Sequence, residues 1–300
     1  MARLDLVGVG CVSIDDLLYV DASPTDDKGR IQASERQPGG NIATALVAAA
    51  GLGASVAFAG RLSDREDGAV VRADLAAHGV DLEFALPDPQ ARPIRATVVV
   101  FQQGDRFIAY DDATTIGLLP GDDVTPLLQA RTVLLDTYAL APTMTALGSD
   151  VNRVLVVADV EAEVESAPLR QVQHLVLPMA FARQLTGETE PAAIVTALWN
   201  DHRATVVVTG GADGMWFRDA ARAECQYQPS FEVPVVDTTG CGDVFHGAYA
   251  VALARGLDAL ERVRYAAAAG AICATGRGGR GHLPTQDEIV RLLARGPETC

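Results

Sequence analysis

Residues 236–247 read VDTTGCGDVFHG and place a carboxylate among glycines where a helix is expected to begin. The first N–H groups of a helix have no partner inside it and carry about half a positive charge, so a glycine-lined helix start binds anions such as phosphate. Gly240 and Gly242 let the backbone approach such an anion without a Cβ in the way. The motif therefore predicts an anion-binding helix start.

Asp243 stands in the first turn of this helix, where the dipole keeps a carboxylate ionised. A carboxylate beside an anion hole suits phosphoryl transfer, because it takes the proton of an attacking hydroxyl while N–H donors stabilise the moving phosphoryl group. The alternative is that Asp243 and the neighbouring threonines only cap the helix. His246 follows on the same helix face, and it either tunes the base or serves as a buried structural histidine.

The elements that must position this motif alternate between strands and helices. Short apolar, β-branched runs predict strands at 4–10, 54–60, 132–136, 154–159, 174–178 and 204–210. Ala- and Leu-rich stretches predict helices at 40–52, 66–78, 140–149, 179–186 and 190–201, and the chain is mainly helical after about Val236. This alternation predicts an α/β fold with a buried, mostly parallel sheet that binds ligands at the carboxyl ends of its strands.

Two stretches break the alternation. Residues 15–36 and 92–111 resemble strands with turns, the second as a hairpin around Gln103–Gly104–Asp105. Since both interrupt the α/β units, we expect them to meet as a small β lid over the active edge of the sheet. The predicted organisation is an α/β core of residues 1–14, 37–91 and 112–300, with the lid inserted in two pieces.

Composition limits the classes of partner. The chain of 300 residues is 49% hydrophobic, with a formal net charge of −15 and a pI near 4.7, so it should repel nucleic acids and anionic membrane surfaces. The N-terminus does not resemble a secretory signal, and no apolar run approaches the roughly 18 residues of a membrane span. The scattered cysteines predict reduced thiols and a cytoplasmic protein. They are Cys11, Cys225, Cys241, Cys273 and Cys300.

Two motifs together resemble the signatures of the ribokinase-like (PfkB) carbohydrate kinases. DTTGCGDVFHGAYAVALARG resembles the C-terminal signature, with Gly240, Cys241, Gly242 and Asp243 at the family's Gly-Ala-Gly-Asp, and residues 38–68 resemble the N-terminal one. The resemblance covers essentially the whole chain. It implies a three-layer ribokinase-like fold with a β lid, and an enzyme that moves the γ-phosphoryl group of ATP to a sugar hydroxyl. Asp243 would be the base and the 240–243 backbone the anion hole.

The resemblance also implies the sugar contacts, which are Asp15, Gly39, Gly40, Asn41 and Arg106. The Gly-Gly-Asn triplet and the lid arginine are similar to the ketohexokinase-like branch of the family, although Thr44 stands where that branch often has a second Asn. Asp16 competes with Asp15 for the sugar. Lys28 and Arg30 are candidates to hold a second anionic group, in which case the substrate would carry a phosphate or a sulfonate, as in the similar sulfofructose kinases.

For the nucleotide, the loop in VVVTGGADG (206–214) resembles the family's ATP loop and implies contacts from Thr209, Gly211 and Gly214. In ATGRGGRGHLP (274–284), Gly276 would line the same pocket, and Arg277 or Arg280 would touch phosphate. An ordinary turn between strands and a plain loop between helices are the alternatives.

The metal site departs from the family. Many relatives have Asn-x-x-Glu after the fifth predicted strand, where this chain has Pro178, Met179, Ala180 and Phe181. The resemblance implies ATP with Mg²⁺, held through water by Asp159 and Glu161, and K⁺ is a further candidate. Mg²⁺ prefers water and substrate phosphates to a full protein cage, so one distant carboxylate could suffice.

Four functions stay open, of which the last, a dehydrogenase, is favoured only by the incomplete dinucleotide motif VGVGCVS, where Ser13 occupies the third glycine position. The first is an ATP-dependent kinase of a ketosugar, and the second is a kinase of a phosphorylated or sulfonated sugar or of a nucleoside. The third is a sugar-binding regulator without catalysis, which the missing Asn-x-x-Glu favours. In each case the exposed edges of the lid predict a homodimer that pairs through it.

Overall fold

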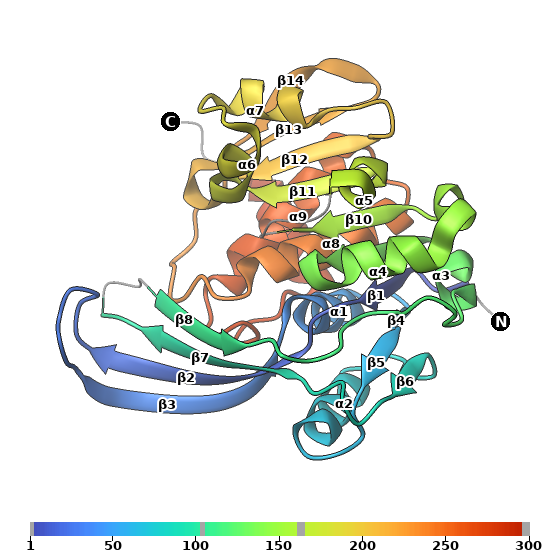
Figure 1. Ribbon diagram of the computed structural model, residues 1–300. Coiled ribbons are helices and arrows are strands. Elements are labelled where there is room, and N and C mark those ends of the chain that lie inside the picture. Colours follow the sequence, from blue (N-terminus) through green and yellow to red (C-terminus); the bar gives the residue numbers. More distant parts are fainter. Residues whose placement is uncertain (1–2, 103–105, 161–165, 296–300) are drawn as a thin grey trace.

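The computed structural model describes residues 3–102, 106–160 and 166–295. Its main element is an eight-stranded sheet (Figure 1). Within this sheet β4, β1, β9, β10, β11 and β12 run parallel, and β13 and β14 add an antiparallel edge. In spatial order they are β14 (Arg222–Gln228), β13 (Met215–Asp219), β12 (Thr205–Thr209), β11 (His174–Pro178), β10 (Val156–Asp159), β9 (Thr132–Asp136), β1 (Leu6–Val9) and β4 (Val56–Phe58). The predicted mostly parallel sheet is confirmed.

Helices cover both faces of this sheet because successive strand residues point to opposite sides and both sides are apolar. On β1, for example, Leu6 belongs to one hydrophobic core and Val7 to the other. The first core packs under α1 (Asn41–Gly51), α2 (Asp67–Ala77), α8 (Cys241–Ala254), α9 (Ala259–Cys273) and α10 (Gln286–Arg295). The second packs under α3 (Thr125–Gln129), α4 (Thr137–Leu147), α5 (Ser166–Gln171), α6 (Met179–Thr186) and α7 (Pro191–Leu198). The short 3₁₀ helices are η1 (Gly148–Arg153) and η2 (Gly211–Asp213).

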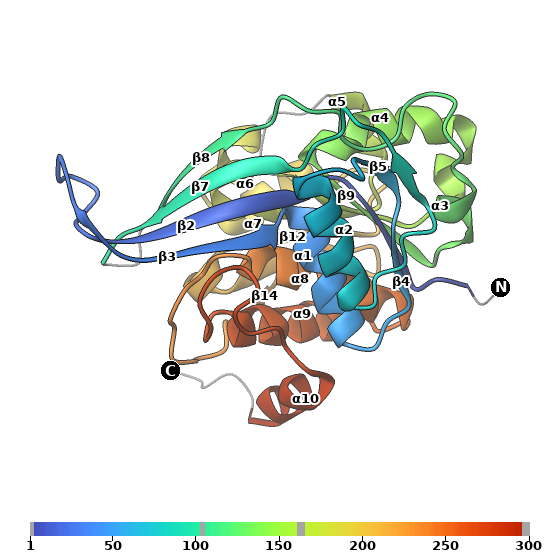
Figure 2. The ribbon, with the colours of Figure 1, turned by 90° about the horizontal axis from the view of Figure 1, so that it is seen from below.

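A second sheet of four strands projects from one side of the core as the lid (Figures 1 and 2). Its order is β3 (Arg30–Gly39), β2 (Ser13–Asp21), β7 (Ile94–Val100) and β8 (Arg106–Asp111). The two outer pairs are antiparallel and β2 pairs with β7 in parallel. The predicted hairpin centre at 103–105 lies outside the described residues. A small parallel pair, β5 (Gly60–Leu62) and β6 (Ala85–Pro87), completes the strands.

The lid is continuous with the core at the place where the sugar motif lies. β2 begins at Ser13, four residues after β1 ends, and β3 ends at Gly39, with only Gly40 between it and the first residue of α1. In the lid sheet Asp15 lies opposite Gln37 on β3 and Ala96 on β7. These side chains share the face turned toward the 274–284 loop between α9 and α10, because Gln37 lies beside Gly278 in that loop.

Candidate active site

Gly240 and Gly242 at the start of α8 differ in the space that each leaves for a side chain. Gly240 has φ +74°, and a Cβ there would lie 2.5 Å from Cα of Gly279, so a side chain would both strain the backbone and clash. At Gly242 a Cβ would meet open space. The helix start is therefore packed against the 274–284 loop on one side and open on the other.

Asp237 holds the loop before α8 and the 274–284 loop together. Its carboxylate accepts the N–H of Thr239 at 2.8 Å and the N–H of Gly278 at 2.9 Å. The first bond is an Asx turn, which the sequence DTT could have indicated, whereas the contact with Gly278 depends on tertiary packing. Asp237 thus holds the loop that contains Gly276 against the start of α8.

Asp15 and the Gly-Gly-Asn triplet meet at the base of the lid. The Ser13 hydroxyl donates to Asp15 Oδ1 at 2.7 Å, and a Cβ at Gly39 would lie 2.0 Å from Asp15 Oδ2. Gly40 has φ +93°, and a Cβ there would lie 2.8 Å from the carbonyl oxygen of Cys11. Only glycines fit here. Burial raises the pKa of Asp15, and the Ser13 hydroxyl offsets part of this effect.

The lid carboxylate and the α8 carboxylate approach the same residue. Burial raises the pKa of the Cys11 thiol, and the negative charges of Asp136, Asp15 and Asp243 raise it further. A thiol feels several charges in this way only when they lie near it. Asp15 and Asp243, which are 228 positions apart in the sequence, thus both act on the thiol of Cys11.

Asp136 connects the loop after β1 to α4, which packs on the second core. Its carboxylate accepts the N–H of Cys11 at 2.5 Å and the N–H groups of Tyr138 and Ala139 at 3.0 Å each, so it also caps α4. Burial raises its pKa to about 6, although these N–H donors lower it. The loop from Gly10 to Cys11 is therefore fixed between β1 and the lid.

Arg106 reaches from the lid to the loop before α8. From β8 its guanidinium donates to the Thr238 hydroxyl at 2.9 Å. Arg277, in the 274–284 loop, stacks over the lid residue Tyr19 with its guanidinium carbon 5.4 Å from the ring centroid. Arg280 instead pairs with Asp74 and donates to the Thr44 hydroxyl. Two of these arginines thus connect lid and core, and the third holds α1 to α2.

Asn41 lies on a buried polar link that the sequence did not reveal. Its side-chain amide donates to Asp159 Oδ2 at 3.3 Å, and Asp159 Oδ1 lies 3.5 Å from Nε2 of His246. Asp159 and His246 are 2% and 4% exposed. The other candidate for the metal, Glu161, lies outside the described residues. Among the described residues, no group of three or more His, Cys, Asp or Glu side chains is arranged to hold a metal ion.

The predicted nucleotide residues follow β12 at the same edge of the sheet. Thr209 ends β12, and its hydroxyl donates to the carbonyl of Leu177 at 3.4 Å. Gly211 is exposed in η2, whereas a Cβ at Gly214 would lie 2.6 Å from the carbonyl of Gln228. β12 lies two strands from β10, and the register places Thr209 two residues beyond Val207, the residue that lies across the sheet from Asp159.

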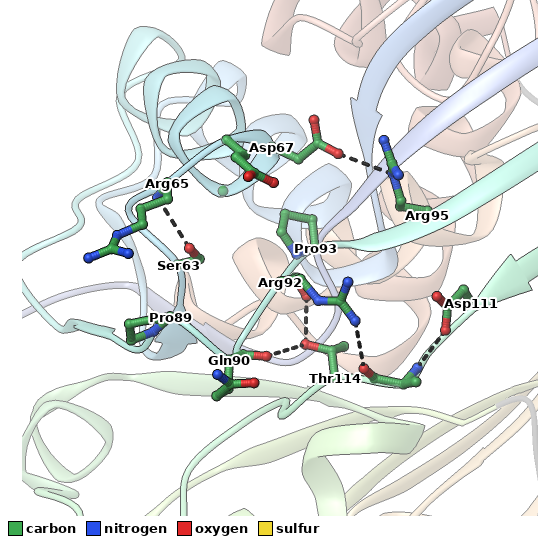
Figure 3. A pocket seen from close by; sticks show the side chains of 13 residues that line it. Ser63, Arg65, Asp67, Pro89, Gln90, Arg92, Pro93, Arg95, Asp111 and Thr114 are labelled. Carbon is green, nitrogen blue, oxygen red and sulfur yellow. Dashed lines mark hydrogen bonds and ion pairs between the residues drawn. The ribbon is translucent and has the colours of Figure 1, made fainter.

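A separate pocket of about 330 Å³ lies at the base of the lid near the start of α2 (Figure 3). Its lining includes Arg65, Arg92 and Arg95, and Arg95 pairs with Asp67 at 3.2 Å. The predicted site residues that the structure describes do not line it. Through the parts of the chain that the structure covers, no helix has the length and hydropathy needed to span a membrane.

A three-layer core, a four-stranded lid and a glycine-lined helix start beneath it define a ribokinase-like fold. Residues 4–286 match the pfkB family carbohydrate kinase, and the chain belongs to this family. It is accordingly an ATP-dependent carbohydrate kinase, and the expected fold and enzyme class are confirmed.

Named relatives agree with this assignment. A ribokinase from Bacillus subtilis is 28% identical over 312 residues, which cover 95% of this chain and 98% of the relative. Fructokinase-1 from Zea mays is 29% identical, over 87% of this chain and 89% of its own. A solved structure, Arabidopsis thaliana ribokinase complexed with ribose and ATP, matches 98% of this chain and 99% of that chain with a TM-score of 0.83 and 24% identity. The last likeness bears on the fold alone.

Proposed function

We propose that this sugar kinase uses Asp243 to deprotonate the acceptor hydroxyl and the 240–243 backbone to bind the transferred phosphoryl group. The observation that carries the proposal is the start of α8, which Gly242 leaves open and which the lid reaches through the bond from Arg106 to Thr238. A sugar between the two carboxylates would place one hydroxyl at Asp243 and others at Asp15. The amide groups of α8 would stabilise charge on the phosphoryl group as it moves.

The remaining sugar contacts in this proposal come from the lid and its base. Gly39 and Gly40 allow close approach of the backbone, and Asn41 lies at the first position of α1. Arg106 is exposed on β8 and already reaches Thr238, so it would close over the bound sugar. Closing the lid excludes water, which limits hydrolysis of ATP.

ATP would lie along the loops after β12 and before α8, with Thr209, Gly211, Gly214 and Gly276 as its neighbours. Bound Mg²⁺ would neutralise charge on the ATP phosphates. Its direct ligands would be phosphates and water, because Asp159 is buried against Asn41 and His246 and fits only a contact through water. Glu161 and K⁺ stay candidates from the sequence.

We propose a ketose as the acceptor, on the basis of the Gly-Gly-Asn triplet and the lid arginine. The ketohexokinase-like branch remains a proposal, since the two named relatives are a ribokinase and a fructokinase. Lys28 and Arg30 are exposed at the lid and are the candidates for a phosphate or sulfonate on the substrate. We also propose a cytoplasmic homodimer that associates through the lid.

A panel of ketoses, aldoses, phosphorylated and sulfonated sugars and nucleosides, assayed with Mg·ATP and ADP release, tests the substrate class. We expect the highest kcat/KM with an unmodified ketose. A preference for a sulfonated or phosphorylated sugar that is lost in the Lys28→Ala, Arg30→Ala double variant would instead identify the second anionic group. Binding of sugars without any ADP release would support the non-catalytic regulator.

A further inference from the structure

His246 links α8 to two strands of the large sheet. Its Nδ1 lies 2.8 Å from the carbonyl oxygen of Gly242, one turn earlier in α8. Its Nε2 lies 3.3 Å from the carbonyl oxygen of Val176 on β11 and 3.5 Å from Asp159 Oδ1 on β10. Both ring nitrogens thus face oxygen atoms. All of these oxygens are acceptors, so bonding on both sides at once takes an N–H on each nitrogen, that is, the imidazolium form of the ring.

Asp159 carries the link on toward the sugar site. Its carboxylate is 2% exposed, and its second oxygen accepts the side-chain amide of Asn41 at 3.3 Å. A side-chain amide can donate and accept in either orientation, so the carboxylate determines which way the Asn41 amide points. With one N–H bonded to Asp159, the Asn41 amide keeps its second N–H and its oxygen for other partners.

We propose that His246 is a positioning residue for the sugar site, because it holds Asp159 and through it the side chain of Asn41. This inference rests on the proposed function of Asn41 as a sugar contact. Because His246 also holds the Gly242 carbonyl, it fixes the distance between the sugar side of the site and the first turn of α8. Small misplacements of groups that orient a reacting hydroxyl lower turnover strongly.

Removal of the imidazole should therefore affect the sugar more than ATP. In His246→Leu, which keeps a buried side chain of similar size, we expect the KM of the sugar to rise about tenfold, the change that follows when one hydrogen bond of average net strength is lost. The KM of ATP should stay within about twofold. His246→Gln, whose amide can still donate toward Asp159, should recover most of the sugar affinity.

His174→Leu is the matched control. His174 is also a buried histidine that contacts α8, with Nδ1 3.1 Å from the Tyr249 hydroxyl and 3% exposure, but it lies at the opposite end of β11 from Pro178. We expect it to lower the unfolding temperature as His246→Leu does and to leave both KM values unchanged. An equal rise in sugar KM in the two leucine variants would overturn the proposal.

A double variant tests whether His246 acts through Asn41. Combined with Asn41→Ala, the change His246→Leu should raise the sugar KM no further than Asn41→Ala alone. Effects that multiply would show that the histidine acts by another route and would contradict the positioning role.

A readout without activity separates this inference from the proposed function. The side-chain amide signals of Asn41 in NMR spectra, assigned by their loss in Asn41→Ala, should shift in His246→Leu and in Asp159→Asn but not in His174→Leu. If they shift while the wild type phosphorylates no sugar, the link stands and the proposed function fails. If they do not move in His246→Leu, the link is wrong whatever the substrate is.

Discussion

Asp15 and Asp16 are neighbours in the sequence, but β2 turns them to opposite faces of the lid. Asp15 is bonded to Ser13 and packed against Gly39, whereas Asp16 is half exposed and lies 3.9 Å from Arg36. The sequence left both as candidates because periodicity gives the alternation of a strand but not which face meets the core. Pairing with β3 and β7 decides between them.

We therefore expect Asp15→Asn to raise the KM of the sugar about 10- to 100-fold, since a hydrogen bond to a charged group contributes roughly 1.5–3 kcal/mol. Asp16→Asn is the control on the same strand and should change it less than about twofold. Steady-state kinetics with the best substrate of the panel measures both. An effect of Asp16→Asn as large as that of Asp15→Asn would contradict the assignment.

The polar residues that hold the site together were not predictable in the same way. Asp159 was proposed only for the metal, and His246 had two open interpretations. Their contacts join α8, β10, β11 and the start of α1, which become neighbours only when the whole sheet is assembled. The sequence indicated the residue types but not their partners.

At the scale of elements, most predicted strands and helices lie within a few residues of those in the structure. α4 is an informative difference, because a helix was expected at 140–149 and is found at Thr137–Leu147 with Pro142 inside it. The carboxylate of Asp136 accepts the N–H groups of Tyr138 and Ala139 and so begins the helix directly after β9. Of the antiparallel edge strands, β13 was implied only by the alternative of a turn between strands at 206–214, and β14, whose short, mixed sequence lacks a clear apolar run, was not predicted.

The lid provides a prediction at this scale. Arg106 and Arg95 come from adjacent lid strands, but Arg106 bonds Thr238 before α8 whereas Arg95 pairs with Asp67 at the start of α2. We expect Arg106→Ala to lower kcat/KM for the sugar about tenfold, which corresponds to about 1.4 kcal/mol, and Arg95→Ala to leave it nearly unchanged. Equal losses in the two variants would mean that the lid acts only as a cover, without a specific contact from Arg106.

At the scale of the whole molecule, the alternation of strands and helices was enough to predict an α/β fold with a mostly parallel sheet, and the two interruptions were enough to predict the lid. That the site residues come together in one place was predictable only from the resemblance to the family. The carboxyl ends of parallel strands meet at one edge, but which loops fold over that edge depends on strand order. Here β1, which leads into the lid, lies two strands from β10.

The outer strands of the lid support the proposed dimer. β3 and β8 are the edges of the lid sheet, and Ile31 and Phe107 on them are 55% and 60% exposed. Phe107→Asp should shift the sedimentation coefficient from dimer to monomer at micromolar concentration. Val290→Asp, at a 53% exposed position on α10, should not. A wild-type protein that sediments as a monomer throughout would refute association through the lid.

The most direct test concerns Asp243, because a base and a helix cap predict different losses. Asp258 is a true cap of α9, with its side chain accepting the N–H of Glu261, and it serves as the control. With saturating sugar and Mg·ATP, Asp243→Asn should lower kcat by about 10²- to 10⁴-fold while calorimetry still detects both ligands, and Asp258→Ala should lower stability but not kcat. Turnover of Asp243→Asn within a few-fold of the wild type would contradict its role as the base.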